Sequence, residues 1–281
     1  MVNTKLEQMN LLDKFLFDEA MEDGKTYEAV VSILLENEVE ILEKSETEKE
    51  FRVSPELRQV RLDVVGMDRA GTVYYTEMQQ RNTGNLLKRS RYYQAQLDVS
   101  LLEPGSVNFN VLNDSCFILI APFDIFGRGL YRYTFEGVCR ECPDLKLNDG
   151  AVRIFINTKG TNDSEFSQEF LEFMKYIGET TDDTAENSGS DRIKRIHAAV
   201  KQIKKSEKAG MRIMQRWEEL VYEREDGKKE GKEEGKEEGK EEVNKLGVMM
   251  KEAGRVDEFM DSLSDKEFQE KLFVEFGLKE A

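Results

Sequence analysis

The alternation of apolar and polar residues divides the chain into helical and extended segments. Between residues 10 and 44, apolar residues recur at helical spacing, with a break at Asp23-Gly24. Residues 58–68 include a run of β-branched side chains, and residues 72–80 include another after the Gly-containing turn at 68–71. Two short extended runs around such a turn predict a β-hairpin.

The segments after the hairpin predict one helix and then further strands. The helix covers residues 85–105, and Asn82 or Thr83 is expected to cap it. Three apolar runs predict strands, at residues 116–123, 129–137 and 152–158. The first of these runs is continuously apolar, which suits a strand buried on both faces. The order of these elements indicates an α/β fold with a mixed sheet.

The C-terminal part of the chain is predicted to be helical. Residues 164–224 have helical spacing, interrupted by a polar loop at 179–191. A four-residue unit of Gly, Lys and Glu then repeats from Gly227 to Glu242, as a solvated helix or a flexible linker. We therefore expect a core domain at 1–162, a helical extension at 163–226, a linker at 227–242 and a helical tail at 243–281.

The composition disfavours membrane proteins, secreted proteins and zinc proteins. No apolar run approaches the ~20 residues that cross a bilayer, and the N-terminal segment lacks the pattern of a signal peptide. We therefore expect a cytoplasmic protein with no membrane contact. The three cysteines include the pair Cys139 and Cys142, but a zinc site needs about four ligands, and the single histidine, His197, is distant in sequence. Zinc and histidine-based catalysis are both disfavoured.

Charge is distributed unevenly along the chain. The formal net charge is −16, which taken alone disfavours nucleic acid as a partner. However, residues 192–216 carry nine basic residues and one acidic residue, whereas residues 218–242 carry twelve acidic and six basic ones. The basic helix could bind DNA or could pair with the acidic segment that follows it.

The hairpin carries the residues with the clearest chemistry. If the turn centres near Ala70, residues whose numbers sum to 140 lie opposite each other, which pairs Asp63 with Glu77. Gln79 shares the face of Glu77, because side chains alternate along a strand. Two carboxylates this close suit Mg²⁺ or Mn²⁺. Exposed hairpins also carry acids without a metal, but Val73 and Tyr75 share this face and favour partial burial.

These residues, in this order, resemble a known family of nucleases. Asp63, then Glu77-Met78-Gln79, then the helix with Arg89-Ser90-Arg91-Tyr92-Tyr93, are similar to the PD-(D/E)XK superfamily. The resemblance is greatest to its recombination-promoting nuclease (Rpn), or putative transposase, branch. Members of that branch often end in Gly/Glu/Lys repeats, and residues 11–21 resemble its first helix. The resemblance covers residues 10 to 160.

The resemblance implies a fold and a reaction. The fold would be a central mixed β-sheet flanked by helices, here with a helical C-terminal extension, and the reaction would be Mg²⁺-dependent hydrolysis of DNA. Asp63 and Glu77 would be metal ligands, with Gln79 as the third catalytic residue. The superfamily usually has lysine in place of Gln79, and glutamine can orient water but cannot supply positive charge. An additional acidic ligand could be Asp18 or Glu19.

DNA contacts are expected from basic residues just after the motif. Arg81, Lys88, Arg89 and Arg91 are the candidates for phosphate contacts, although a solvated helix face would also explain each of them. Tyr93 lies on the apolar stripe of the helix and is expected in the core.

Three functions are compatible with this pattern. The first is an endonuclease in recombination or mobile-element biology. The second is a nuclease-fold protein that has lost activity and binds DNA or a protein. The third is a structural homo-oligomer held together through the helical extension.

Overall fold

A computed structural model of the chain describes residues 6–42, 64–102, 105 and 107–279. The chain divides into two compact units, Met1–Met214 and Gln215–Ala281. The segment 163–226 was expected to form a helical extension with a basic helix, and its apolar residues from Phe170 to Ile213 are part of the core of the first unit.

The first unit contains a mixed sheet, as predicted. Within the described residues its strands follow the order β1-β2-β3-β5-β4. The strands are β1 (Val64–Met67), β2 (Val73–Met78), β3 (Ser115–Ala121), β4 (Arg132–Phe135) and β5 (Ala151–Asn157). The three central strands β2, β3 and β5 are parallel, and β1 and β4 are antiparallel to their neighbours. Every residue of β3 is buried, which confirms the strand that was expected to be covered on both faces.

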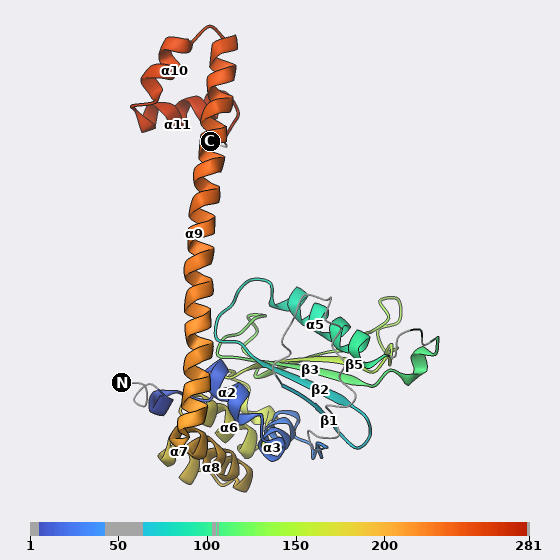
Figure 1. Cartoon of the computed structure of the whole chain (residues 1–281). Helices are drawn as coiled ribbons and strands as arrows, with labels where there is room; N and C mark the ends of the chain where they lie inside the picture. The colour runs from blue at the N-terminus through green and yellow to red at the C-terminus, as the bar shows by residue number, and fades with distance from the viewer. Residues whose placement is uncertain (1–5, 43–63, 103–104, 106, 280–281) are drawn as a thin grey trace. The chain divides into compact units, whose positions relative to one another are not determined.

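Helices cover both faces of this sheet (Figure 1). One face packs against α5 (Leu86–Leu101), and the other packs against α2, α3, α6 and α8. The helices of the second group are α2 (Lys14–Ala20), α3 (Gly24–Leu35), α6 (Gln168–Gly178) and α8 (Asp191–Lys205). Short helical turns are η1 (Phe109–Val111), η2 (Asp163–Glu165) and α7 (Asp182–Glu186). The α/β class expected from the sequence is therefore confirmed.

Helix boundaries differ from the sequence predictions in three places. The first helical segment ends at Leu35 rather than near residue 44, because Glu36 adopts a left-handed conformation with φ 54°. Helix α5 has Asn85 at its N-cap, not Asn82 or Thr83. The polar segment 179–191 contains the short helix α7, where Thr181 and Thr184 form a capping box.

Helix α3 is tied to strand β2 by a buried tyrosine. The Tyr27 hydroxyl donates to the Tyr74 carbonyl at 3.0 Å and lies 3.0 Å from Thr76 Oγ1. The same ring passes so close to β1 that a Cβ on Gly66 would lie 2.6 Å from it. Glycine at position 66 therefore permits the close approach of helix to sheet.

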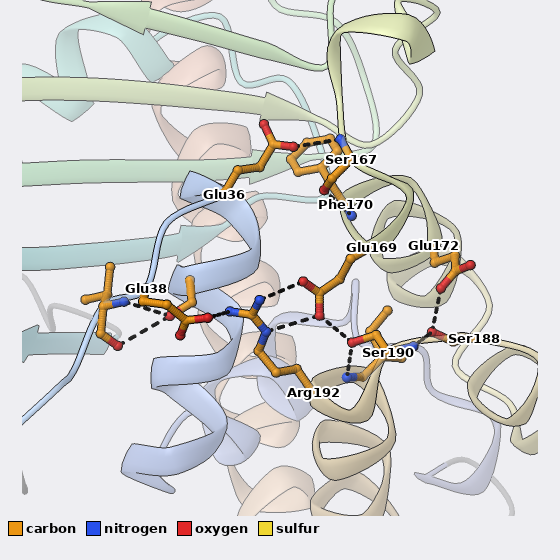
Figure 2. A network of polar contacts seen from close by, with 12 residues as sticks. Glu36, Glu38, Ser167, Glu169, Phe170, Glu172, Ser188, Ser190 and Arg192 are labelled. Atoms are coloured by element: carbon orange, nitrogen blue, oxygen red, sulfur yellow. Dashed lines mark hydrogen bonds and ion pairs between the residues drawn. The ribbon is translucent and has the colours of Figure 1, made fainter.

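A network of polar contacts joins α6, α8 and the segment after α3 (Figure 2). The Arg192 guanidinium donates to Glu169 through Nε at 3.1 Å and Nη2 at 2.8 Å, and its Nη1 lies 3.2 Å from Glu38 Oε1. Ser190, the N-cap of α8, also donates to Glu169 Oε1 at 2.5 Å. These contacts pair Arg192 and Ser190, at the start of the basic helix, with acidic residues of the same unit.

Other basic side chains between residues 192 and 212 are paired in the same way. Lys201 Nζ lies 2.8 Å from Asp182 Oδ2, and Arg212 forms an ion pair with Glu19. The sequence had left DNA or the acidic segment as the alternatives for this basic helix. The observed partners of these side chains are instead acids of the first unit, distant in sequence.

The long helix α9 (Glu207–Glu252) starts in the first unit and continues into the second. The Gly/Lys/Glu repeat lies within it, so the helical alternative for this tract is the observed one. In the second unit, α10 (Val256–Ser262) and α11 (Lys266–Glu275) form a small apolar core with the end of α9, made by Leu246, Met250, Leu272 and Phe273. Among the described helices, none is both long enough and apolar enough to span a bilayer.

The three cysteines are expected to differ strongly in reactivity. Cys116 is buried in β3, and burial raises the pKa of its thiol to about 12, whereas Cys139 and Cys142 are partly or fully exposed. Thiolate is the reactive form. Ellman's reagent should therefore modify two thiols of the native protein quickly and the third only after denaturation. Rapid reaction of all three thiols in the folded chain would contradict the burial of Cys116.

Candidate functional site

The hairpin has the register that the sequence predicted, as far as the structure describes it. Val64 pairs with Thr76, Val65 with Tyr75, Gly66 with Tyr74 and Met67 with Val73, so each pair sums to 140. Asp63, the expected partner of Glu77, lies outside the described residues. Its position opposite Glu77 therefore stays a prediction.

Glu77 is a buried carboxylate near the end of β2. Its residue is 4% exposed, and it shares the face of Val73 and Tyr75, which pack beneath α5. Gln79 follows on the same face, and its backbone N–H continues the pairing with β3 by donating to Ile120 O at 2.9 Å. The predicted common face of Glu77 and Gln79 is consistent with a shared contact: both side chains reach Arg89.

Arg89, in the first turn of α5, joins these two side chains. Its Nη2 donates to Glu77 Oε1 and to Gln79 Oε1, each at 2.5 Å. Its guanidinium also lies over the Tyr93 ring, 5.7 Å from the centroid. Arg89 had been expected to contact DNA phosphate as a surface residue. In the structure its side chain is only 23% exposed and points at the motif.

Several buried polar atoms around Glu77 have no partner among the described residues. They are Glu77 Oε2, Arg89 Nε and the Tyr75 hydroxyl. Buried polar groups are nearly always hydrogen-bonded, so each such atom requires an explanation, such as a bound ion or water. Three such atoms on neighbouring side chains indicate a binding site for a polar ligand.

The electrostatic environment favours a cation beside Glu77. Burial raises the pKa of the Glu77 carboxyl, and the Arg89 and Lys14 charges only partly oppose this effect, while the Asp18 carboxylate adds to it. Burial together with the charge of Glu77 also raises the pKa of Tyr75 well above its usual value. An additional positive charge would therefore stabilise the ionised form of Glu77.

The structure distinguishes between the two acids of the first helix. Asp18 is close enough to Glu77 for its charge to raise the pKa of that carboxyl. Glu19 points elsewhere: it is buried and forms an ion pair with Arg212. Asp18 is therefore the acid of α2 whose charge acts on Glu77. Lys14 was not identified from the sequence, although it lies one helical turn before Asp18, a spacing that places both on one face.

The other basic residues expected to bind DNA lie on the surface. Arg81, Lys88 and Arg91 are exposed, in the connection from β2 to α5 and in the first turns of α5. Tyr93 is partly buried and meets Tyr75 edge-to-face, with centroids 5.9 Å apart, as expected for a core residue. Arg89 is thus the member of this set that belongs to the Glu77 site.

The chemistry of these donors suits a hard cation. Glu77 Oε2 is a buried carboxylate oxygen that lacks a described partner, and the Asp18 carboxylate is nearby. Such oxygens are the ligands that Mg²⁺ and Mn²⁺ prefer. Within the described ranges no group of three or more His, Cys, Asp or Glu residues is arranged to hold a metal. A complete ligand set would therefore need Asp63 or solvent.

Comparison with known proteins gives no match to a protein-family model, to a curated protein or to a solved structure.

Proposed function

We propose that the chain is a metal-dependent endonuclease of the PD-(D/E)XK kind that hydrolyses DNA, in the cytoplasm, in recombination or mobile-element biology. The observation that carries the proposal is Glu77, a carboxylate that is buried at 4% exposure and keeps one oxygen without a described partner. It stands in a hairpin whose register leads to Asp63. The mixed sheet flanked by helices supports the same proposal.

The proposed roles follow from the positions of the side chains. Glu77, with Asp63 and Asp18, would hold Mg²⁺ or Mn²⁺, which when bound supplies Lewis acidity that activates water and polarises the scissile phosphate. Gln79 has its Nε2 directed to Arg81 O at 2.7 Å, and its Oε1 accepts from Arg89. Both ends of its amide are therefore held by hydrogen bonds, so that Gln79 can orient a neighbouring group at the site, such as the Arg89 guanidinium. Hydrolysis forms one P–O bond from water and breaks one P–O ester bond.

Plasmid cleavage tests this function directly. Supercoiled DNA should be nicked or linearised by the full chain with Mg²⁺ or Mn²⁺, and EDTA should stop the reaction. Binding of Mn²⁺, measured by electron paramagnetic resonance, gives an independent readout. A chain that binds no Mn²⁺ and leaves the plasmid supercoiled would refute the proposal.

One observation favours a second candidate, a nuclease-fold protein without activity. Arg89 already satisfies Glu77 Oε1 and Gln79 Oε1, and it provides the charge that a cation would otherwise provide. If this ion pair excludes metal, the chain would bind DNA or a protein without cleaving it. The Mn²⁺ measurement separates the two candidates, because only the enzyme needs the metal.

DNA binding is expected to depend on salt. If Arg81, Lys88 and Arg91 each contact a phosphate, the log–log slope of affinity against salt should be about −2.7, a loss of roughly 40-fold between 50 and 200 mM. Replacing Lys88 by glutamine should flatten the slope by about 0.9, while Arg140→Gln, at an exposed position in the connection from β4 to β5, should leave it unchanged. An affinity that does not change with salt would exclude these phosphate contacts.

A further inference from the structure

The position at which the superfamily carries lysine is neutral in this chain, yet a positive charge is present beside it. Gln79 cannot bear charge. Its Oε1, however, accepts a hydrogen bond from Arg89 Nη2 at 2.5 Å, and the same nitrogen donates to Glu77 at 2.5 Å. The guanidinium thus stands between the two motif residues, although it comes from a different element, helix α5.

The arginine is placed more firmly than neutralising one acid would require. It bonds both motif side chains, and the ring of Tyr93 lies against it, with the guanidinium carbon 5.7 Å from the centroid. A side chain that served only as a counter-ion to Glu77 would have no need of Gln79. Guanidinium is always charged, and its fork of donors matches the oxygens of a phosphate.

Glu77 and Arg89 each retain a polar atom that could bind a ligand. Arg89 Nε and Glu77 Oε2 are both buried and have no hydrogen-bond partner within the described part of the chain. One donor and one acceptor therefore remain, on side chains that are already held in place. A phosphate oxygen suits the donor, and a cation suits the acceptor.

We propose that Arg89 is a catalytic residue that supplies, from α5, the positive charge that the superfamily's lysine supplies from position 79. This inference rests on the proposed nuclease function. Arg89 contacts a non-bridging oxygen of the scissile phosphate and stabilises the charge that develops there, while it keeps all of its protons. Gln79 then has the role of holding the guanidinium rather than of replacing the lysine.

A charge-relocation experiment tests this role. Plasmid cleavage at saturating Mn²⁺ is measured for the wild type, Arg89→Gln, Gln79→Lys and the double variant that carries both changes. Arg89→Gln should lose about 100-fold in kcat, as expected when one transition-state donor is removed. The double variant should recover to within about tenfold of wild type, because its lysine restores the charge at the usual position. Arg140→Gln, an equal change of charge at an exposed position of the β4–β5 connection, is the matched control.

Mn²⁺ affinity separates catalysis from metal binding and folding. Arg89→Gln should bind Mn²⁺ at least as tightly as wild type, because a competing cation has been removed from Glu77. The proposal is overturned if Arg89→Gln cleaves within threefold of wild type, or if a folded, Mn²⁺-bound double variant is as inactive as the single one.

If Arg89→Gln does not fold, the double variant and Arg89→Lys carry the test, since each keeps one positive charge. If the wild type binds Mn²⁺ and cleaves DNA, the nuclease proposal stands even when the Arg89 variants contradict the role proposed for Arg89. If the wild type neither binds Mn²⁺ nor cleaves DNA, both proposals are refuted.

Discussion

Replacing Glu77 or Asp63 by alanine is expected to reduce DNA cleavage at least about 100-fold, since a metal contributes several kcal/mol to such reactions. Glu77 is buried and has an oxygen available for a cation, and Asp63 is the residue that the hairpin register predicts opposite it. Cleavage of supercoiled plasmid under single-turnover conditions measures the loss. Both variants should also lose Mn²⁺ binding.

The control for this pair is Glu141→Ala. Glu141 is an exposed acid in the connection from β4 to β5, so its removal changes the net charge equally without touching the hairpin. It should cleave like wild type. An Asp63→Ala variant that cuts as well as wild type would show that the metal ligands are assigned wrongly, even if Glu77→Ala is inactive.

The second large effect is expected on stability, at the ion pair between Glu19 and Arg212. Glu19 has a side chain that is only 3% exposed, and Arg212 donates to it through Nη2 and, at 3.2 Å, through Nε. Arg212→Met would leave a buried carboxylate unpaired. We expect a loss of about 3 kcal/mol in the free energy of unfolding, at the lower end for such pairs because Arg212 is partly exposed. Urea denaturation followed by circular dichroism measures it.

A double-mutant cycle identifies the cause of that loss. Adding Glu19→Gln to Arg212→Met removes the unpaired charge, so the double variant should be more stable than Arg212→Met alone. Lys208→Met changes an exposed residue of the same helix and should have little effect. If Arg212→Met unfolds at the same urea concentration as wild type, the pair contributes nothing measurable.

Local patterns were sufficient to predict the hairpin and the buried central strand of the sheet, but not the order of the strands. The turn at 68–71 and the alternation along β2 predicted the hairpin register, and the continuous apolar run from 116 predicted a strand buried on both faces. These features depend on neighbours in sequence, and a strand pairs its side chains by simple alternation. The helix break at Asp23-Gly24 was also predicted from the sequence, and in the structure Asp23 is the N-cap of α3.

Contacts between distant segments could not be predicted in this way. Arg89 was assigned to DNA because a helix that follows a motif gives no sign of which face turns back toward the strand. The choice of Asp18 over Glu19 likewise depends on Arg212, which lies 193 residues after Glu19. Three basic residues of α8 and early α9, namely Arg192, Lys201 and Arg212, have acidic partners in other elements. The composition gives the number of these charges, but it does not show which acid each basic residue contacts.

The missing cap of α5 has a consequence for motion at the site. Asn85 makes no side-chain cap, and its Oδ1 instead accepts from Thr83 Oγ1 at 2.6 Å, so the first turn of the helix lacks a usual stabilising bond. Strand β2, by contrast, is hydrogen-bonded on both edges and fastened from behind by Tyr27. The contacts of Arg89 with Glu77, Gln79 and Tyr93 therefore hold a helix start that lacks its own cap. Amide hydrogen exchange should accordingly be slower along β2 than at the first residues of α5, and Arg89→Gln should speed up exchange at that helix start.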